Sequence, residues 1–219
     1  FIAPYDREFR FLKQENCRLA EKLVLEVDCN WKFAAENLQD NYHTPFLHTG
    51  TIGPTVTPVV RFKGERPSSA PFIAFYDAAP MTFDSKSRFG PMPWLIDRGI
   101  KFACSGHVAP LFHILARGDN VHPVVFTPVG VGHTRIECFQ MFPAEWFDDP
   151  QFSEKLAAYS DFTLALLKED AMVMESLHDA ASSSRFEPGR FSNYENGVWN
   201  LINYNVDRIF GDADPTLYA

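Results

Sequence analysis

The sequence predicts an α+β domain in which an antiparallel sheet precedes a long helix. The first supporting observation is a series of strand-like segments between residues 72 and 142, separated by turn residues. The second is an amphipathic stripe that continues from Phe152 to Leu177, as expected of one long helix. The third is the length of 219 residues, which suits one large domain. We therefore expect residues 1–219 to form a single domain.

The N-terminal part of the chain predicts a strand followed by a helix. Within the segment 18–27, residues 23–27 form an aliphatic, strand-like run. Asn30 is a suitable N-cap, which predicts that a helix begins at the next residue. The helix is expected to reach about residue 42, because its apolar residues recur at helical spacing: Trp31, Ala35, Leu38 and Tyr42.

Polar residues follow the same spacing on the neighbouring face of this helix. Glu36, Asp40 and His43 recur at i, i+4 and i+7, and His48 follows shortly afterwards. Because proline disturbs the interior of a helix, Pro45 predicts a bend between His43 and His48. On a straight helix, side chains five residues apart would point about 140° away from each other. The two imidazoles therefore need this bend to converge.

The middle of the chain predicts a loop and then most of the sheet. Residues 51–69 are rich in Gly, Pro, Thr and Ser and indicate a loop with one short strand at 59–62. Gly118-Asp119-Asn120 is a typical turn between two later strands. The spacing favours an antiparallel meander of five strands, at 72–76, 100–103, 110–116, 121–128 and 134–142.

The long helix is predicted to begin at Asp149-Pro150, with the acid as N-cap and proline in the first turn. Asp170 lies where the stripe requires a hydrophobic residue, and a buried, unpaired carboxylate normally takes up a proton, pairs or binds metal. A loop at 182–188 and a final amphipathic helix containing Val198 and Ile202 follow. The predicted stripe of the long helix is Phe152, Leu156, Tyr159, Thr163, Leu166, Asp170, Val173 and Leu177.

Composition excludes two classes of partner. The net charge is −8 and there is no basic stripe, which argues against a nucleic-acid partner. No apolar run approaches the roughly 18 residues needed to cross a bilayer, and no signal peptide is recognisable. We expect a cytoplasmic protein without a membrane partner.

The cysteines predict neither a disulfide framework nor a zinc site, because no C-x-x-C occurs. Cys104-x-x-His107 matches half of a cluster site, but no C-x-H lies upstream. His107 and His113 would share one face of an unbroken strand, where a core or surface role is more ordinary than a pocket role. We expect reduced, partly buried thiols at Cys17, Cys29, Cys104 and Cys138.

His43, His48 and Asp170 are the candidate metal ligands. Two imidazoles and one carboxylate, with other positions left open, form the facial triad of non-haem Fe(II) oxygenases. Asp40, one turn before His43, is the candidate to hydrogen-bond an imidazole and tune the metal. The plainer alternatives are two ordinary histidines at a bent helix end and a solvated acid at position 40.

These residues together resemble a known family, the Rieske-type non-haem iron oxygenases or ring-hydroxylating dioxygenases. The pattern extends from Arg18 to Phe210 and is similar to the C-terminal catalytic domain of the α subunit. Two positions depart from it: Glu36 lies one residue from the acid of several relatives, and His178 stands where glutamine is more common. The matching residues are Asn30-Trp31-Lys32, Glu36-x3-Asp40-x2-His43-x4-His48, Glu169-Asp170, Gly189-Arg190-Phe191-Ser192 and Glu195.

The resemblance implies a helix-grip (START-like) fold, with an antiparallel sheet wrapped around a long C-terminal helix. It also implies that His43, His48 and Asp170 bind mononuclear Fe(II). Asp40 would link this iron to a Rieske [2Fe-2S] cluster in a neighbouring subunit. No Rieske ligand set occurs here, so the N-terminal Rieske domain is expected to be absent from this chain, and the start at Phe1 without methionine agrees with an excised piece.

The implied activity is that of a terminal oxygenase component, mono- or dioxygenating an aromatic or related small organic substrate with O₂. The product would be a cis-diol, an alcohol or a demethylated amine or ether. A ferredoxin or reductase would supply the electrons, and the implied full-length assembly is a homotrimer. Phe33, Phe46 and Leu47 are candidates to line a substrate pocket, although they suit the core equally well.

Two other classes stay open at this point. The helix-grip architecture also serves non-catalytic modules that bind apolar small ligands, and a fold alone does not settle function. Such a module has no need for Asp170 on its core stripe opposite two histidines. A zinc hydrolase would also use His and Asp ligands, but H-E-x-x-H is absent.

Overall fold

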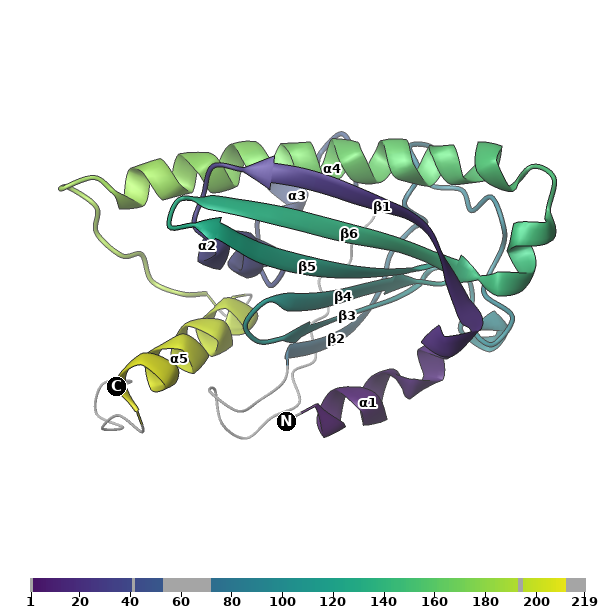
Figure 1. Cartoon of the computed structure of the whole chain (residues 1–219), viewed down its shortest axis with the longest axis horizontal. Coiled ribbons are helices and arrows are strands. Elements are labelled where there is room, and N and C mark those ends of the chain that lie inside the picture. The colour runs from purple at the N-terminus through teal and green to yellow at the C-terminus, as the bar shows by residue number, and fades with distance from the viewer. Residues whose placement is uncertain (1, 41, 53–71, 193–194, 212–219) are drawn as a thin grey trace.

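The structure is a computed structural model that describes residues 2–40, 42–52, 72–192 and 195–211. Its centre is a six-stranded antiparallel sheet with the order β1-β6-β5-β4-β3-β2 (Figure 1). The five-strand meander is confirmed, and β1 extends it by pairing with β6. The strands are β1 (Cys17–Val27), β2 (Phe72–Asp77), β3 (Phe102–Val108), β4 (Phe112–Arg117), β5 (Val121–Gly130) and β6 (His133–Pro143).

Two strands of the meander begin two residues later than predicted. The strand predicted at 100–103 begins at Phe102 and continues to Val108, through residues with weak strand propensity. Since β3 pairs with both β2 and β4, its neighbours override that propensity. The strand predicted at 110–116 begins only at Phe112 and includes Arg117. The predicted strand at 59–62 lies outside the described residues.

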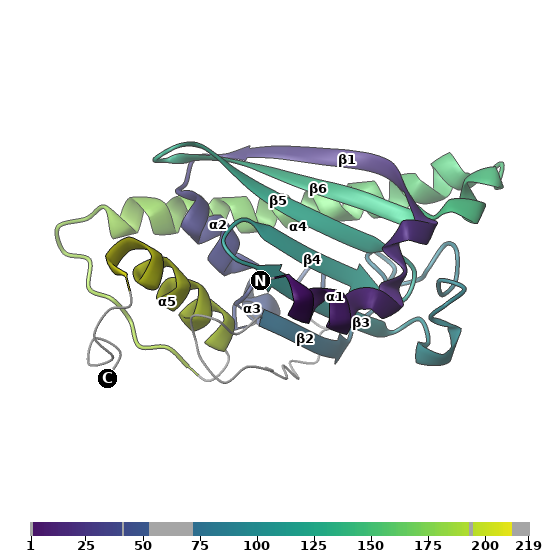
Figure 2. The same cartoon turned by 60° about the horizontal axis from the view of Figure 1, so that its bottom comes forward.

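One long helix, α4 (Phe152–Ala181), runs along one face of the sheet, and the shorter α1 (Ala3–Phe9) lies against the other (Figures 1 and 2). The predicted α+β, helix-grip arrangement is therefore confirmed, although α5 (Asn196–Phe210) follows the long helix. Among the described residues, the remaining helices are α2 (Trp31–Asn37), α3 (Thr44–Leu47) and four 3-10 turns at Arg10–Leu12, Gln14–Asn16, Ile96–Arg98 and Ala144–Asp148. In the described part of the chain, no helix has the length and apolar character required to cross a membrane.

Each face of the sheet buries its own hydrophobic core. Val124 and Phe126 of β5 pack with Leu167 and Met174 of α4. On the opposite face, the core contains Ile73, Cys104 and Ile114 from the sheet and Tyr5 and Phe9 from α1. This division follows from strand geometry, because successive side chains point to opposite faces. α2 contacts α4 and α5 at one end of the first core.

Two helix boundaries correct the sequence predictions. The Asn30 side chain accepts a hydrogen bond from the Lys32 N–H, so the predicted N-cap is confirmed. However, α2 ends at Asn37 rather than near residue 42. The long helix begins at Phe152, and Asp149 instead accepts the N–H of Gln151 in a turn before it. Asp149 is therefore not the N-cap: it lies two residues before the N-cap, Gln151, and its side chain stabilises the preceding turn.

The four cysteines are thiols, as predicted. Three of them are buried, and burial raises the pKa of Cys104 and of Cys138 to about 12. They therefore behave as small hydrophobic residues rather than as nucleophiles or ligands. Cys104 lies in the core beneath α1, whereas His107 belongs to the opposite face of β3, since it is an odd number of residues away.

Candidate metal centre

His43, His48 and Asp170 converge on one point between α3 and α4. His48 Nε2 lies 3.3 Å from His43 Nε2 and 3.0 Å from Asp170 Oδ1, and His43 Nε2 lies 3.6 Å from the same carboxylate oxygen. Three atoms at these separations can all lie about 2.1 Å from one ion, the usual length of metal–imidazole and metal–carboxylate bonds. In the described residues, this is the one group of three such side chains arranged to hold a metal.

The local sequence brings the two histidines together through a single helical turn. Pro45 lies in the first turn of α3, where a missing N–H has no cost, and not in a helix interior. His43 is the N-cap of this four-residue helix and His48 is its C-cap. The predicted bend between the histidines is therefore wrong: residues 44–47 form a helical turn, and the helix that begins at Trp31 already ends at Asn37. The helix ends before His48, and the Nε2 atoms of the two histidines lie 3.3 Å apart despite the divergence expected on a straight helix.

Asp170 comes from the buried side of α4. The stripe is correct at Tyr159, Thr163, Leu166 and Asp170, all of which are buried. Its C-terminal end is wrong, because Met174 is buried in place of Val173 and Leu177 is 49% exposed. The predicted stripe repeats every seven residues, whereas a straight helix has 3.6 residues per turn, so the stripe drifts by about 20° per heptad and loses its phase along this 30-residue helix.

The environment of Asp170 fits a bound cation. This side chain is 5% exposed, and its Oδ1 makes no hydrogen bond to any described residue, although His48 Nε2 is close. A buried carboxylate oxygen without a partner is costly unless a proton or a cation satisfies it. His48 is 2% exposed, so the point where the three side chains meet is shielded from solvent.

Carboxylates hold the outer nitrogen of each imidazole. Glu169 Oε2 lies 2.7 Å from His48 Nδ1 and also accepts a hydrogen bond from Thr51, while Asp40 Oδ2 lies 3.1 Å from His43 Nδ1. A carboxylate accepts hydrogen bonds, so both histidines carry their proton on Nδ1 when neutral. Their Nε2 lone pairs then point to the shared centre, as metal ligation requires.

Asp40 also organises the turn before α3. Its carboxylate accepts the backbone N–H of Tyr42 at 2.6 Å and that of His43 at 3.3 Å. The sequence pattern contains Glu169 but does not predict its contact with His48. A sign of this contact is that Glu169 directly precedes a candidate metal ligand on the same helix.

Electrostatics at His48 favour a positive charge. Burial lowers the pKa of His48, but the nearby carboxylates of Asp170 and Glu169 outweigh burial, so the net pKa is raised. A divalent cation at the shared centre would gain from the same carboxylates. Half-buried Glu36 is a separate feature: burial raises its pKa to about 7, with Lys32 acting in the opposite direction.

A pocket opens from this centre towards the sheet and encloses about 60 Å³. Its walls are formed by α2, α3, α4 and the concave face of β2, β3 and β4. Phe33, Phe46 and Leu47 do not line it: Phe46 is 69% exposed and Phe33 packs on the ring of His178. The lining residues are Asn37, Leu38, Asp40, His43, Thr44, His48, Ile52, Tyr76, Met81, Ser105, Leu115, Arg117, Leu166 and Asp170.

His107 and His113 lie side by side on the sheet, apart from the pocket lining. They are register partners in β3 and β4, and their ring centroids are 5.6 Å apart. Burial lowers the pKa of His107 to about 4 and that of His113 well below its usual value. Both are therefore neutral core histidines, in agreement with the plainer interpretation of the sequence.

Comparison with solved structures supports the fold. The quaternary ammonium Rieske monooxygenase CntA has a TM-score of 0.68 at 16% identity, over 95% of this chain and 53% of the other. For dicamba monooxygenase the values are 0.57, 16%, 85% and 57%. For naphthalene 1,2-dioxygenase from Rhodococcus sp. they are 0.62, 13%, 97% and 62%.

The chain thus spans about half the length of these oxygenases. A search of curated protein sequences gives no match. Residues 14–210, however, match the family described as the ring hydroxylating alpha subunit (catalytic domain). Together with the antiparallel sheet and long helix, this match shows that the chain belongs to the ring-hydroxylating α-subunit family.

Proposed function

We propose that this chain is the catalytic domain of a Rieske-type non-haem iron oxygenase and that His43, His48 and Asp170 bind mononuclear Fe(II). The observation that carries the proposal is a buried set of three ligand atoms, all within 4.8 Å of one another, at the end of a pocket. When bound, Fe(II) with three protein ligands and open positions supplies activation of O₂ next to an organic substrate.

The side chains around the ligands have separate tasks in this proposal. Glu169 and Asp40 hold the Nδ1 protons of the two histidines and thereby keep each Nε2 free for the metal. Leu166, Met81 and Leu115 form an apolar wall that limits water next to the reacting groups. Since 60 Å³ is less than the roughly 300 Å³ of a small ligand site, a ring-sized substrate requires some of these side chains to shift.

We further propose that Asp40 links the iron site to a Rieske [2Fe-2S] cluster supplied from outside residues 1–219. Its carboxylate is only partly buried and contacts His43, so it connects a ligand with the protein surface. In the named neighbours the matching region is about half of a longer chain, which agrees with a separate cluster domain. A ferredoxin or reductase would deliver the electrons, the working assembly would be a homotrimer, and residues 1–219 would form one catalytic domain.

The test is metal content after anaerobic loading with Fe(II). We expect about one iron per chain in the parent, by analogy with other triad sites, and loss of that iron in His43→Ala and in Asp170→Ala. Asp161→Ala, an exposed acid on the same helix, and His133→Ala are matched controls that should retain the iron.

Circular dichroism of each variant checks that the fold is intact. A folded parent that takes up no stoichiometric iron contradicts the proposal and favours the non-catalytic module that binds an apolar ligand. Iron that persists in both ligand variants contradicts the assignment of the triad.

A further inference from the structure

Arg117 is a buried cation in the wall of the pocket. It ends β4, is 3% exposed, and donates from Nη1 to the Tyr76 hydroxyl at 3.0 Å and to the Ala116 carbonyl at 3.4 Å. Its Nε has no hydrogen-bond partner. In the described residues, no carboxylate oxygen lies close enough to Arg117, within 4.0 Å, to form an ion pair with it. Burial of an unpaired guanidinium is costly, so its presence calls for an explanation.

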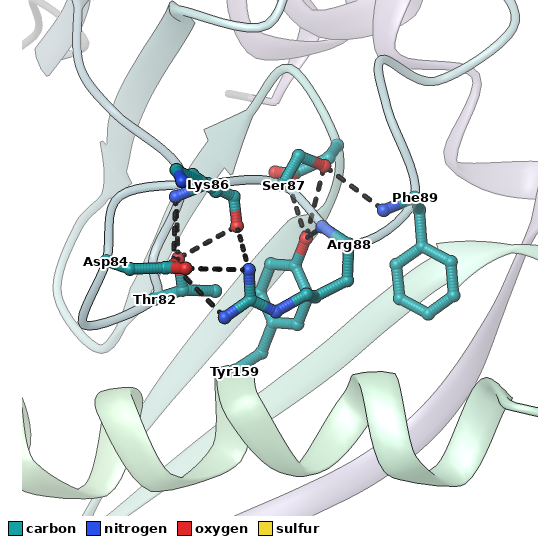
Figure 3. A network of polar contacts seen from close by, with 8 residues as sticks. Thr82, Asp84, Lys86, Ser87, Arg88, Phe89 and Tyr159 are labelled. Carbon is teal, nitrogen blue, oxygen red and sulfur yellow. Dashed lines mark hydrogen bonds and ion pairs between the residues drawn. The ribbon is translucent and has the colours of Figure 1, made fainter.

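Asp119, the nearest acid along the chain, forms no ion pair with Arg117, although the charge of Arg117 acts on its carboxyl group. Asp119 Oδ2 accepts a hydrogen bond from the Tyr159 hydroxyl at 2.7 Å. The same hydroxyl accepts the N–H of Arg88, in the loop shown in Figure 3, so Asp119 is part of a network that ties this loop to α4. Burial raises the pKa of Asp119 more than its hydrogen bonds and the charge of Arg117 lower it.

Arg117 shares the pocket with the candidate metal ligands. The sheet side of the pocket presents Arg117 with Tyr76 and Ser105, and the helix side presents His43, His48 and Asp170. Antiparallel register explains this placement, because Ala103 pairs with Arg117 and Ser105 with Leu115, on one face of the sheet. The space between the two polar sides is bordered by Leu115, Met81 and Leu166.

The charges of the lining favour an anionic occupant once a divalent cation is present. The charged side chains of the lining are Asp40, Asp170 and Arg117. Among the lining side chains alone, the two carboxylates offset a divalent cation and Arg117 adds one positive charge, while Glu169 lies behind His48 and outside the lining. A planar guanidinium whose Nε has no hydrogen-bond partner matches the geometry of a carboxylate.

We propose that Arg117 binds a carboxylate group of the substrate, so that the substrate is a small organic acid whose apolar part faces the metal centre. Tyr76 and Ser105 provide hydroxyl groups on the same side of the pocket. That the bound acid is a substrate rests on the proposed oxygenase function, and the charge of the lining favours an anion only when a divalent cation occupies the centre.

The test is binding of two acid and amide pairs by calorimetry, acetate with acetamide and benzoate with benzamide. The smaller pair suits the free volume of the pocket without rearrangement. In the parent, anaerobically loaded with Fe(II), we expect the acid of at least one pair to bind about tenfold or more tightly than its amide, as for a charged hydrogen bond. Arg117→Met should abolish this preference, and Arg117→Lys should keep part of it.

Thermal unfolding separates this role from a structural one. If Arg117 serves to bind a ligand, the fold does not require its charge, and a methionine of similar length avoids burying that charge. The unfolding temperature of Arg117→Met should therefore equal or exceed that of the parent. Arg135→Met, on the exposed side of β6 beside Glu26, is the matched control and should bind both pairs like the parent.

Absence of any acid preference in the parent, or its persistence in Arg117→Met, overturns the inference. If Arg117→Met does not fold, a reduced preference in a folded Arg117→Lys supports the inference, and an unchanged preference in that variant overturns it. Without iron uptake, an Arg117-dependent preference would still establish the anion subsite while the oxygenase proposal failed. Iron uptake without an Arg117-dependent preference would leave the oxygenase proposal standing and end this one.

Discussion

At the scale of single residues, Glu169 and Asp40 play equivalent parts, because each contacts one of the two histidines. Each carboxylate contacts the Nδ1 of one imidazole, whose Nε2 points to the shared centre. Glu169 has the shorter contact, 2.7 Å against 3.1 Å, and its histidine is the more buried. Orientation by such outer partners typically changes metal affinity by about 10–100-fold.

We predict that Glu169→Gln weakens Fe(II) binding about 10–100-fold without unfolding the chain. An amide can present its NH₂ group to His48 Nδ1, and it lacks the negative charge that favours a cation nearby. Anaerobic titration of the apoprotein with Fe(II) measures the affinity. Glu154→Gln, an exposed acid in the first turn of the same helix, is the control. Equal affinities in the two variants would show that the Glu169 contact is incidental.

The location of Arg117 in the pocket wall depends on residues that are not adjacent to it in sequence. Along the sequence it lies just beyond a predicted strand, next to a turn, where an exposed arginine is the ordinary expectation. Only the pairing of β4 with β3 places it in the wall of the pocket, opposite the metal centre.

At the scale of elements, α4 has two functions along one face. Leu167 and Met174 pack against the sheet, and Asp170, between them, provides the carboxylate of the candidate metal centre. The rigid helix therefore sets the position of Asp170 relative to the hydrophobic core. The stripe predicted this face correctly as far as Asp170 and wrongly beyond it.

We predict that Leu167→Ala destabilises the fold by about 2–5 kcal/mol, because a buried leucine is replaced by a cavity. Leu177→Ala should change the stability by less than about 0.5 kcal/mol, since Leu177 is 49% exposed despite its predicted place on the stripe. Urea denaturation of both variants gives the comparison. Similar losses in both would argue that Leu177 is buried in solution.

At the scale of the whole molecule, the candidate centre joins two parts of the chain that are far apart in sequence. His43 and His48 flank α3, and Asp170 lies more than a hundred residues later on α4, with the sheet formed in between. A cation held by all three side chains would bind the folded chain and not the unfolded one. Binding would therefore stabilise the fold.

We predict that anaerobic Fe(II) raises the unfolding temperature of the parent, by an amount equivalent to about 2.7 kcal/mol at a metal concentration of 100 times Kd. Asp170→Ala should lose this dependence. Differential scanning calorimetry with and without metal measures it. A parent insensitive to Fe(II), or a variant that still responds, would contradict joint ligation across α3 and α4.

Much of this protein is determined by local sequence patterns. Asn30 predicts the start of α2, because it is the N-cap of that helix. The alternation of strands and turns between 72 and 142 predicts the meander. Asp170 is recognisable as a polar residue on an apolar stripe. These features depend on local chemistry and on fixed periodicities, which a single sequence contains. The D-x2-H-x4-H spacing likewise identifies the two histidines that flank α3.

Other features were decided only by tertiary structure. The early end of α2, the register that brings Arg117 towards the metal centre, and the contact between Glu169 and His48 all involve residues distant in sequence or short helices without a clear period. Their energies come from packing and electrostatics between elements, which local propensity does not contain. The sequence by itself determined which groups are available for chemistry, and the tertiary structure decided which of them meet.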